Sequence, residues 1–490
     1  MALPPHTRRF FFLPLLIASV WVSSCVAPLG PGYTIENQEI RVQFEPAPDP
    51  RIRVDATYQL RNTGTRAMPD MQLRLPGRRL FRLAQAQATW DGVSLAEQSS
   101  PANSRDTLIV FPQPWRVSEN HTLHLSAEFQ NPSPGQTGFS FSSTAFFLPS
   151  EGWVPGLLPS QSLFGTGGVP PKQWRLQVRV PAGFLVHLSG RSPKTLRAGN
   201  EINVLSVQHP EDSYPFVVAG LYKQTVLDAG KQKVFLWTRA QEDSASFRQS
   251  ADALVRAIET YDAAFGTRSQ IGQPFWFVDC PVAAGCFTAQ ESSYANLLSA
   301  EPAAASSELA SRDTLMVDFH GGAPRLAASA PSLASSWLGY GQNPGFYEQL
   351  PPLSAFPAFA AALGEEAIEG PTFRTETIRR ALRMIPSNAA ARKQEDDAVL
   401  RAKSFLFFYA LEERYGREVS SRAFRHMLSA RRGRGFDLDD LIAAFEEETH
   451  QNVAEFVRLW MKRPGVPEDF RSHYRDASAA VLFHSRENTP

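Results

Sequence analysis

The chain offers few residues at the spacing that metal chemistry needs. Two histidines four residues apart on a helix, with a glutamate directly after the first, can hold zinc and activate water. The chain has ten histidines, and only His121 and His124 lie within seven residues of each other. They fall in a segment that alternates like a β-strand, where side chains three residues apart point to opposite faces. Since no His-Glu-x-x-His or His-x-x-Glu-His occurs, we interpret the pair as solvated strand residues.

Nucleophilic serine chemistry has no local signature either. No Gly-x-Ser-x-Gly turn occurs in the chain, and no histidine is close in sequence to Ser332, Ser335 or Ser336. Pro331 favours another interpretation, because proline is well tolerated in the first turn of a helix. We therefore expect these serines to be ordinary residues of an early helical turn. A triad assembled from residues distant in the sequence stays open.

Two of the three cysteines form a possible pair. Cys280 and Cys286 are six residues apart, and in an oxidising compartment such a pair is a disulfide candidate. The bond would close a small loop, so its entropic gain would be modest. Two reduced, buried cysteines are the alternative. Two thiols alone do not make a zinc site, which needs three or four protein ligands.

The third cysteine, Cys25, follows a targeting segment. Basic residues at positions 6, 8 and 9 precede an almost wholly apolar run, 10–22, that is too short for a membrane span of about 20 residues. The run ends in Val22-Ser23-Ser24-Cys25, which resembles the bacterial lipobox. That resemblance implies cleavage before Cys25 and acylation of its thiol and new amino group, which anchors a protein stably to a membrane. An ordinary signal peptide with an incidental cysteine is the alternative.

Composition excludes some partners. The 49 basic and 49 acidic residues cancel, so no overall field favours nucleic acid, and we expect no nucleic-acid partner. With 43% hydrophobic and 20% charged residues, the 490-residue chain suits two or three globular domains. We divide it into a lipoprotein signal peptide (1–24), a Pro- and Gly-rich tether (25–33), a β domain (34–226), a mixed helical domain (227–467) and a tail (468–490).

Period-two alternation dominates the β domain. Apolar and polar residues alternate over 54–61, 123–129 and 174–180, with a turn-forming stretch at 131–135. Repeated runs of this kind predict an antiparallel sandwich or saddle. The whole chain is therefore expected to be an α+β protein.

The period changes to that of helices after residue 227. Leu254, Ile258, Tyr261 and Phe265 share one helical face that ends at Gly266, and 404–411 is apolar enough to predict a buried helix. Asp437 is placed to cap a further helix with its apolar face at 438–445. Short β-like runs at 234–237, 275–278 and 315–319 predict a small sheet, and the Ala- and Ser-rich stretch 303–330 reads as a loop-like insertion.

Four segments, in order, resemble the gluzincin aminopeptidases, the aminopeptidase-N-like family. They are the turn Glu151–Pro155, the strand Pro215–Gly220, the x-Trp-x-Gly of Ser336–Gly339, and the closing segment Asp437–Pro467 with its Trp460-Met461-Lys462-Arg463-Pro464. The resemblance runs from about residue 33 to 467. It implies that the second domain is thermolysin-like, a mixed sheet backed by helices.

The same resemblance locates a degenerate zinc site. Alignment on Trp337 and Gly339 puts Pro331 and Ser335 at the two histidine positions, Ser332 at the general base and Ser354 at the third ligand. Proline has no donor atom and a neutral hydroxyl is a weak zinc ligand. Without the metal and the carboxylate, neither the acidified water nor its base is available. We therefore expect no metal, no cofactor and no catalytic residues at these positions.

Two further family positions differ. The loop that grips a substrate's amino group corresponds to 285–289 and lacks its glutamate, and Arg401 stands where the family has a tyrosine that stabilises the oxyanion. Arg401 is either a site for an anion such as a peptide carboxylate or a structural cation near Glu395, Asp396 or Asp397.

These observations favour an inactive, peptidase-like lipoprotein of the bacterial envelope. It would be tethered to a membrane and would bind a peptide or a protein partner. The alternatives are a hydrolase with a rebuilt site that does not use zinc, and a structural subunit of an envelope complex.

Overall fold

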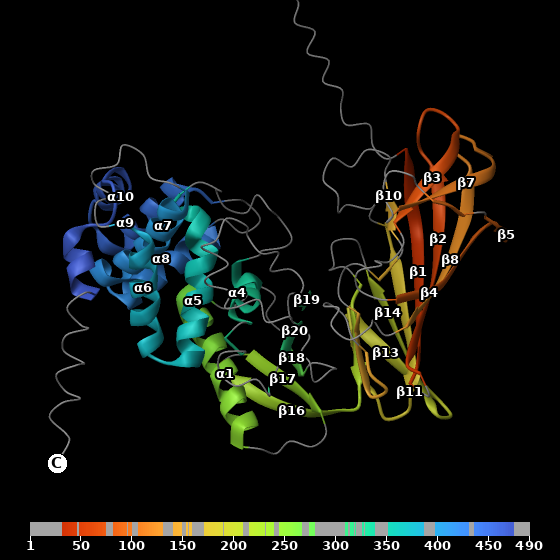
Figure 1. Cartoon of the computed structure of the whole chain (residues 1–490), viewed down its shortest axis with the longest axis horizontal. Helices are drawn as coiled ribbons and strands as arrows, with labels where there is room; N and C mark the ends of the chain where they lie inside the picture. Colours follow the sequence, from red (N-terminus) through yellow and green to blue (C-terminus); the bar gives the residue numbers. More distant parts are fainter. Residues whose placement is uncertain are drawn as a thin grey trace, which may run out of the picture.

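The computed structural model describes most of the chain between residues 32 and 474. The described residues are 32–46, 49–74, 82–95, 97–99, 106–130, 141–148, 153–154, 156–158, 171–189, 191–208, 215–230, 232–239, 245–266, 274–279, 309–311, 314–317, 319, 326–327, 329–338, 351–386, 397–430 and 436–474. They form a mixed α+β structure, as predicted, with the β-rich half on one side and the helices on the other (Figure 1).

An eight-stranded sheet is the main element of the first half. Its strand order is β13 (Arg191–Ala198), β14 (Glu201–Gln208), β11 (Trp174–Pro181), β1 (Tyr33–Glu45), β2 (Arg51–Asn62), β8 (Asn120–Gln130), β4 (Arg82–Trp90) and β5 (Val93–Ser94). Neighbouring strands are antiparallel except β1 and β11, which pair in parallel. The expectation of a purely antiparallel sheet is therefore wrong at this one pair.

The alternation read from the sequence becomes the two faces of this sheet. In β2 the apolar residues from Ile52 to Leu60 are buried in turn, whereas Arg53, Gln59 and Arg61 are exposed. Strands β8 and β11 follow the same pattern. Alternation therefore places the core on one face and a polar surface on the other.

Two smaller sheets cover the buried face. One has the order β10 (Gly156–Leu158), β3 (Met68–Arg74), β7 (Asp106–Trp115) and β6 (Glu97–Ser99). The other has the order β12 (Leu185–Leu188), β15 (Val217–Gly220) and β9 (Ala145–Leu148). Each shares a separate hydrophobic core with the large sheet, so the described strands make a sandwich.

A five-stranded mixed sheet begins the second half. Its order is β16 (Tyr222–Ala229), β17 (Gln232–Arg239), β18 (Phe275–Asp279), β20 (Thr314–Val317) and β19 (Leu309–Ser311). Strands β17, β18 and β20 are parallel, and the outer two are antiparallel to their neighbours. Because β16 already belongs to this sheet, the change between halves lies near residue 221, before the predicted 226. Strand β20 lies at the β-like run predicted over 315–319, and β19 replaces part of the loop expected over 303–330.

Helices make up the rest of this half. They are α1 (Ala245–Phe265), α4 (Ala330–Leu338), the 3-10 turn η2 (Leu353–Ala355), α5 (Phe356–Glu369), α6 (Thr372–Met384), α7 (Asp397–Tyr415), α8 (Arg417–Ala430), α9 (Leu438–Thr449) and α10 (Val453–Lys462). The predicted faces of α1 and α7 are buried. In the predicted face of α9, Leu441 and Phe445 are buried, while Leu438 and Ile442 are partly buried against the same core. Asp437 caps α9 as predicted, in a reciprocal capping box with Asp440. None of the described helices combines the length and apolar character that crossing a membrane requires.

Ordered structure extends past Pro467, where the sequence predicted a tail. Residues 468–474 are helical, and Phe470 and Tyr474 are buried in the helical core. Arg471 donates to the carbonyl oxygen of Ile385, which fixes this helix to the end of α6. The expectation of a tail is therefore wrong for 468–474; residues 475–490 lie outside the described part.

The two halves share one continuous core. Trp237, Val278 and Met316 of the mixed sheet pack with residues of β9, β12 and β15 in a single buried cluster. At its margin His187 of β12 stacks on Trp276, with ring centroids 4.1 Å apart, and lies 2.8 Å from the hydroxyl of Thr314.

Candidate functional site

Helix α4 carries the sequence positions at which zinc ligands were considered. Its inner face is apolar, with Ala330, Leu333, Ala334 and Leu338 all buried. Pro331 is half-buried in the first turn, where proline is tolerated because the N–H that it lacks has no helical partner there. The prediction that the Trp337 helix begins at this proline is thus confirmed to within one residue. Ser332 and Ser335 belong to the same helix by their backbone.

Two consecutive residues of α1 hold the two ends of α4. The hydroxyl of Tyr261 donates to the carbonyl oxygen of Ala330 over 3.0 Å, and the indole nitrogen of Trp337 donates to Asp262 over 3.0 Å. Gln232 of β17 donates to both oxygens of the same Asp262 carboxylate, at 2.8 and 2.9 Å. The carboxylate that Trp337 contacts is therefore already engaged in structural hydrogen bonds.

Tyr261 also fills the space between α4 and α5. A Cβ added to Gly364 of α5 would lie 2.7 Å from Cζ of Tyr261, so only glycine leaves room for this ring. Burial raises the pKa of Tyr261 well above its ordinary value, and the nearby Glu365 carboxyl adds to the effect. The hydroxyl therefore stays protonated and remains a donor to α4.

Ser354, the remaining zinc-site position, lies in the turn η2 that leads directly into α5. It is half-buried between the buried Leu353 and Ala355. The next residue, Phe356, packs against Phe265, Phe408, Phe424 and Phe436 with ring centroids 5.2 to 5.8 Å apart. An aromatic core thus fixes the start of α5.

These residues do not fit a zinc ion. Zinc is held by imidazole, thiolate or carboxylate groups, and positions 331, 332, 335 and 354 have none of these. Within the described residues, no group of three or more His, Cys, Asp or Glu side chains is arranged to hold a metal. No replacement ligands from other parts of the described fold compensate for the missing set.

Arg401 lies on α7, where it is half-buried and takes part in an interaction within the protein. Two of the three acids suggested for it, Glu395 and Asp396, lie outside the described residues. No role was predicted for Lys403, yet this residue is fully buried. Its ammonium donates to the carbonyl oxygens of Met461 and Arg463 at 3.2 and 2.5 Å, and so neutralises the end of α10.

A cluster of ion pairs links helices α5 to α8, and sequence reasoning missed it. Arg374 of α6 lies 2.5 Å from Glu412 of α7 and over the ring of Tyr409, while Glu366 of α5 pairs with Arg417 at 2.9 Å. Burial raises the pKa of Glu412, although the charge of Arg374 opposes this. No sequence motif marks these residues, because they come from four separate helices.

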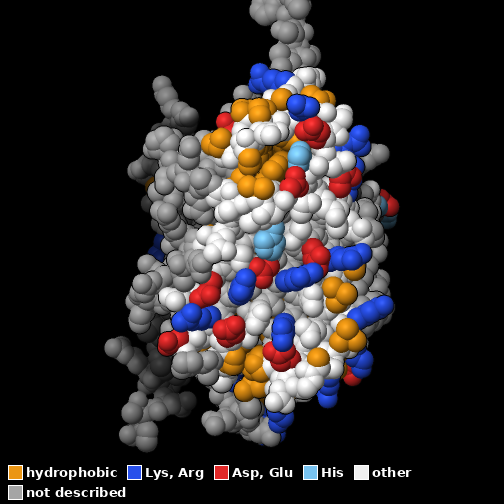
Figure 2. All heavy atoms as spheres, turned by 90° about the vertical axis from the view of Figure 1, so that its right-hand side faces the viewer, with side chains coloured by type: hydrophobic (Ala, Val, Ile, Leu, Met, Phe, Trp, Pro, Cys, Tyr) orange, Lys and Arg blue, Asp and Glu red, His pale blue; other side chains and the backbone are white. Residues whose placement is uncertain are grey.

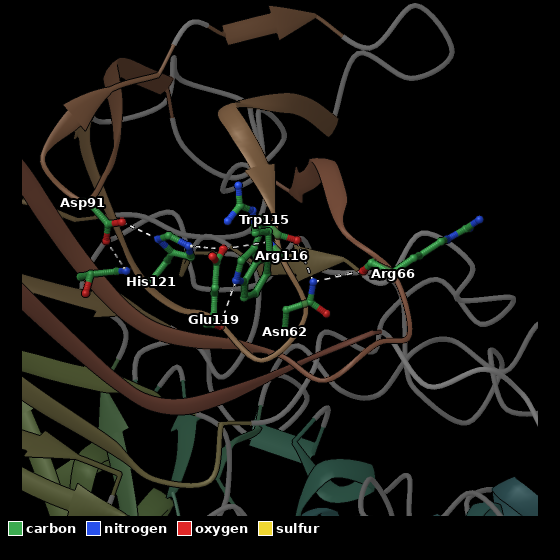
Figure 3. A network of polar contacts seen from close by, with 8 residues as sticks. Asn62, Arg66, Asp91, Trp115, Arg116, Glu119 and His121 are labelled. Carbon is green, nitrogen blue, oxygen red and sulfur yellow. Dashed lines mark hydrogen bonds and ion pairs between the residues drawn. The ribbon is translucent and has the colours of Figure 1, made fainter.

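The histidine pair of β8 takes the predicted opposite faces. Nδ1 of His124 lies 3.1 Å from the hydroxyl of Thr57 on the polar face. His121 stacks on Trp90 and lies between two carboxylates, 2.5 Å from Asp91 and 3.5 Å from Glu119 (Figure 3). The description of the pair as solvated is therefore wrong for His121, which is part of a polar network.

Several predicted positions fall outside the described residues. These are the proposed lipidation site Cys25, the possible disulfide pair Cys280 and Cys286, and the loop 285–289. Of the turn 151–155, only Trp153 and Val154 are described, and Trp153 is fully buried in the core shared by the two halves.

Comparisons with known proteins find similarity in fold alone. No protein-family model matches the chain, and no curated protein matches its sequence. Among solved structures, the M1 zinc metallopeptidase from Deinococcus radiodurans is similar, at 14% identity and a TM-score of 0.47 over 89% of this chain and 95% of that one. A two-domain M1 zinc metallopeptidase mutant bound to L-tryptophan is similar at 14% identity and a TM-score of 0.48, over 89% of this chain and 96% of that one.

Proposed function

We propose that the protein is a non-catalytic, lipid-anchored scaffold of the bacterial envelope that binds a peptide or a protein partner. The observation that carries the proposal is the contrast within α4. The helix is held at both ends by Tyr261 and Asp262, while positions 331, 332 and 335 carry proline and serine. A peptidase-like framework is thus retained around a site that lacks the groups for metal-assisted hydrolysis.

Arg401 does not supply an alternative chemistry. A guanidinium stays protonated at every physiological pH, so it cannot act as a general base. Its role in this proposal is structural, in keeping with the interaction that Arg401 makes within the protein. The half-buried residues Pro331 and Ser354 then mark the region where a partner peptide would be contacted.

Peptide hydrolysis tests the absence of catalysis. The purified protein should release no product from aminoacyl-anilide substrates above the rate in buffer, and the Ser332→Ala/Ser335→Ala variant should give the same trace. Turnover by the unsubstituted protein that disappears in this variant would replace the scaffold with a rebuilt hydrolase.

Membrane fractionation tests the anchor. Exchange of Cys25 for serine should move the protein from the membrane fraction to the aqueous fraction, because the acyl chains would be lost. A Cys280→Ser variant is the matched control and should stay with the membrane. Unaltered partitioning of the Cys25 variant would remove the lipoprotein part of the proposal.

Site-specific crosslinking distinguishes partner binding at α4 from partner binding at another surface. A photoreactive residue at Pro331 should capture a partner in cells, whereas one at Leu459, on the exposed side of α10, should not. Capture from 459 without capture from 331 would favour the structural subunit of an envelope complex.

A further inference from the structure

One end of the large sheet gathers the turns that surround the start of β1. Tyr33 pairs with Asn62 at the end of β2. Asn62 in turn accepts from the backbone N–H of Ser118 at 2.9 Å and donates to the carbonyl oxygen of Trp115 at 2.9 Å. The turn between β7 and β8, which contains Val117, therefore lies directly beside the first described residues of the chain.

This end exposes apolar side chains in a group that we call the apolar tip, defined as Val93, Pro112, Pro114 and Val117. Val93 is 55% and Val117 42% exposed, and both prolines are exposed. Figure 2 shows a group of hydrophobic side chains at the upper end of the molecule, next to a histidine, and a smaller group at the lower end. Singly exposed apolar side chains are common, whereas contiguous apolar patches are typical of contact surfaces.

A rigid aromatic base supports the apolar tip. Trp90 contacts Phe111 at 4.2 Å and Trp115 at 5.4 Å between ring centroids, and all three are buried. Val93 pairs with Trp90 across the two-residue turn Asp91-Gly92, so it projects from this cluster. The tip is therefore presented by a packed platform, which lowers the entropy cost of placing it in a contact.

Polar groups surround the tip without covering it. His121 holds the carboxylates of Asp91 and Glu119, and the side chain of Arg66 points away from this network (Figure 3). Arg61, Arg66 and Arg116 are exposed at the same end. Apolar side chains flanked by basic ones are also found in the amphipathic helices that lie at a lipid headgroup boundary.

The length of the tether indicates which occupant covers the tip. Eight residue steps separate Cys25 from Tyr33, and a chain of that length reaches at most about 30 Å. Strand β1 alone, with 13 residues, extends over about 43 Å. If Cys25 is acylated, the tip end stays within this reach of the bilayer whatever the orientation of the rest of the protein.

We propose that the apolar tip inserts into the headgroup region of the membrane to which the chain is tethered. This inference rests on the lipid anchor of the proposed function. It would orient the sheet with its Tyr33 end on the lipid and would direct the helical half away from it.

Spin labelling of the lipidated full-length protein in phosphatidylcholine vesicles tests the contact. A label on Val117→Cys should be more accessible to oxygen and less accessible to a water-borne nickel chelate than a label on Leu196→Cys. Leu196 is the matched control, because it is an exposed apolar residue near the other end of the same sheet. The protein without added cysteines gives the background from Cys280 and Cys286.

Vesicle binding of the unlipidated Cys25→Ser protein gives an independent readout. Adding Val93→Ser and Val117→Ser should lower its partitioning into phosphatidylcholine vesicles by about tenfold, whereas adding Leu196→Ser should leave it unchanged. Far-ultraviolet circular dichroism checks that each variant is folded.

Equal nickel accessibility of the labels at 117 and 196 in vesicles would overturn the inference. Protection of the 117 label in native membranes but not in pure lipid would also overturn it, and would identify a protein as the occupant. Release of the Cys25→Ser protein from membranes together with either result would leave the proposed anchor standing while the tip contact fails.

Discussion

Helix α4 and the ion-pair cluster of α5 to α8 lie in the same helical half, but different interactions hold them. At α4 the contacts are neutral side chains, backbone carbonyls and the single carboxylate of Asp262. In the cluster, Arg374, Glu412, Glu366 and Arg417 bring four charges together from four helices. Buried charge is thus present in this half, at positions where it is paired and links helices.

This comparison distinguishes two roles of a buried ionisable group, a chemical one and a structural one. A group that does chemistry needs a site where its charge can act on a substrate, whereas the charges of α5 to α8 are satisfied by each other. The helix where the family resemblance would place chemistry has proline and serine instead. The described residues of this half therefore include charges that stabilise its packing, and among them no group of three or more side chains is arranged to hold a metal.

Removal of Arg374 should have the largest effect on stability. The Arg374→Met variant leaves the carboxylate of Glu412, only 3% exposed, without its partner. Breaking a buried pair from one side costs about 3–5 kcal/mol, which urea denaturation would measure.

The double variant Arg374→Met/Glu412→Leu is the control for that loss. It should recover much of the stability, because no unpaired charge is then buried. Equal losses in the single and double variants would show that packing, and not charge, holds this cluster, and the comparison with α4 would fail.

A substitution beside α4 should lower the unfolding free energy by less than Arg374→Met does. Gly364→Ala forces Tyr261 to move, and overpacking of this kind costs about 1–3 kcal/mol. The loss should be less than additive with that of Tyr261→Phe, since both changes act on one contact. Thermal unfolding of the two single variants and the double variant measures this coupling. Full additivity would mean that Tyr261 does not fill the space between α4 and α5.

Loss of the pair between His121 and Asp91 in the β half should lower the unfolding free energy least, by an amount that depends on pH. Burial raises the pKa of Asp91, but hydrogen bonds from His121 and from the backbone of Thr122 lower it further, so the net pKa lies below its ordinary value. The stabilisation is therefore present above the unfolded pKa of about 3.9 and is lost as the pH falls through the folded pKa.

The Asp91→Asn variant isolates this contribution, because asparagine also accepts the positive φ of 47° at this turn position. Its unfolding free energy should fall below that of the unsubstituted protein at pH 7, and the gap should narrow at pH 3. A gap that does not change with pH would assign the effect to the turn and not to the charge.

Much of the fold could be predicted because it depends on the local spacing of apolar and polar residues. Alternation in β2 and β8, the apolar face of α1 and the cap at Asp437 each depend on neighbouring residues. The parallel pairing of β1 with β11 could not be predicted, because more than 130 residues separate the paired positions Gln38 and Trp174. The helix at 468–474 was missed because only the partners of Phe470 and Tyr474 show that it packs.

The candidate site also has features that could be predicted from the sequence and features that could not. The missing ligands at 331, 332, 335 and 354 could be read from residue types alone. The anchoring of α4 by Tyr261 and Asp262 could not, since the hydrogen-bonded partners lie 69 and 75 residues apart. The burial of Lys403 could not be predicted either. Its partners, the carbonyl oxygens of Met461 and Arg463, lie about 60 residues further along the chain and become its neighbours only in the folded protein.

Metal content tests the central claim most directly. Mass spectrometry of the metals in the purified protein, after dialysis against zinc and then against metal-free buffer, should find zinc far below one equivalent per chain. One equivalent of zinc that survives the dialysis would mean that ligands outside positions 331, 332, 335 and 354 hold a metal, and it would contradict the account of a scaffold without a metal site.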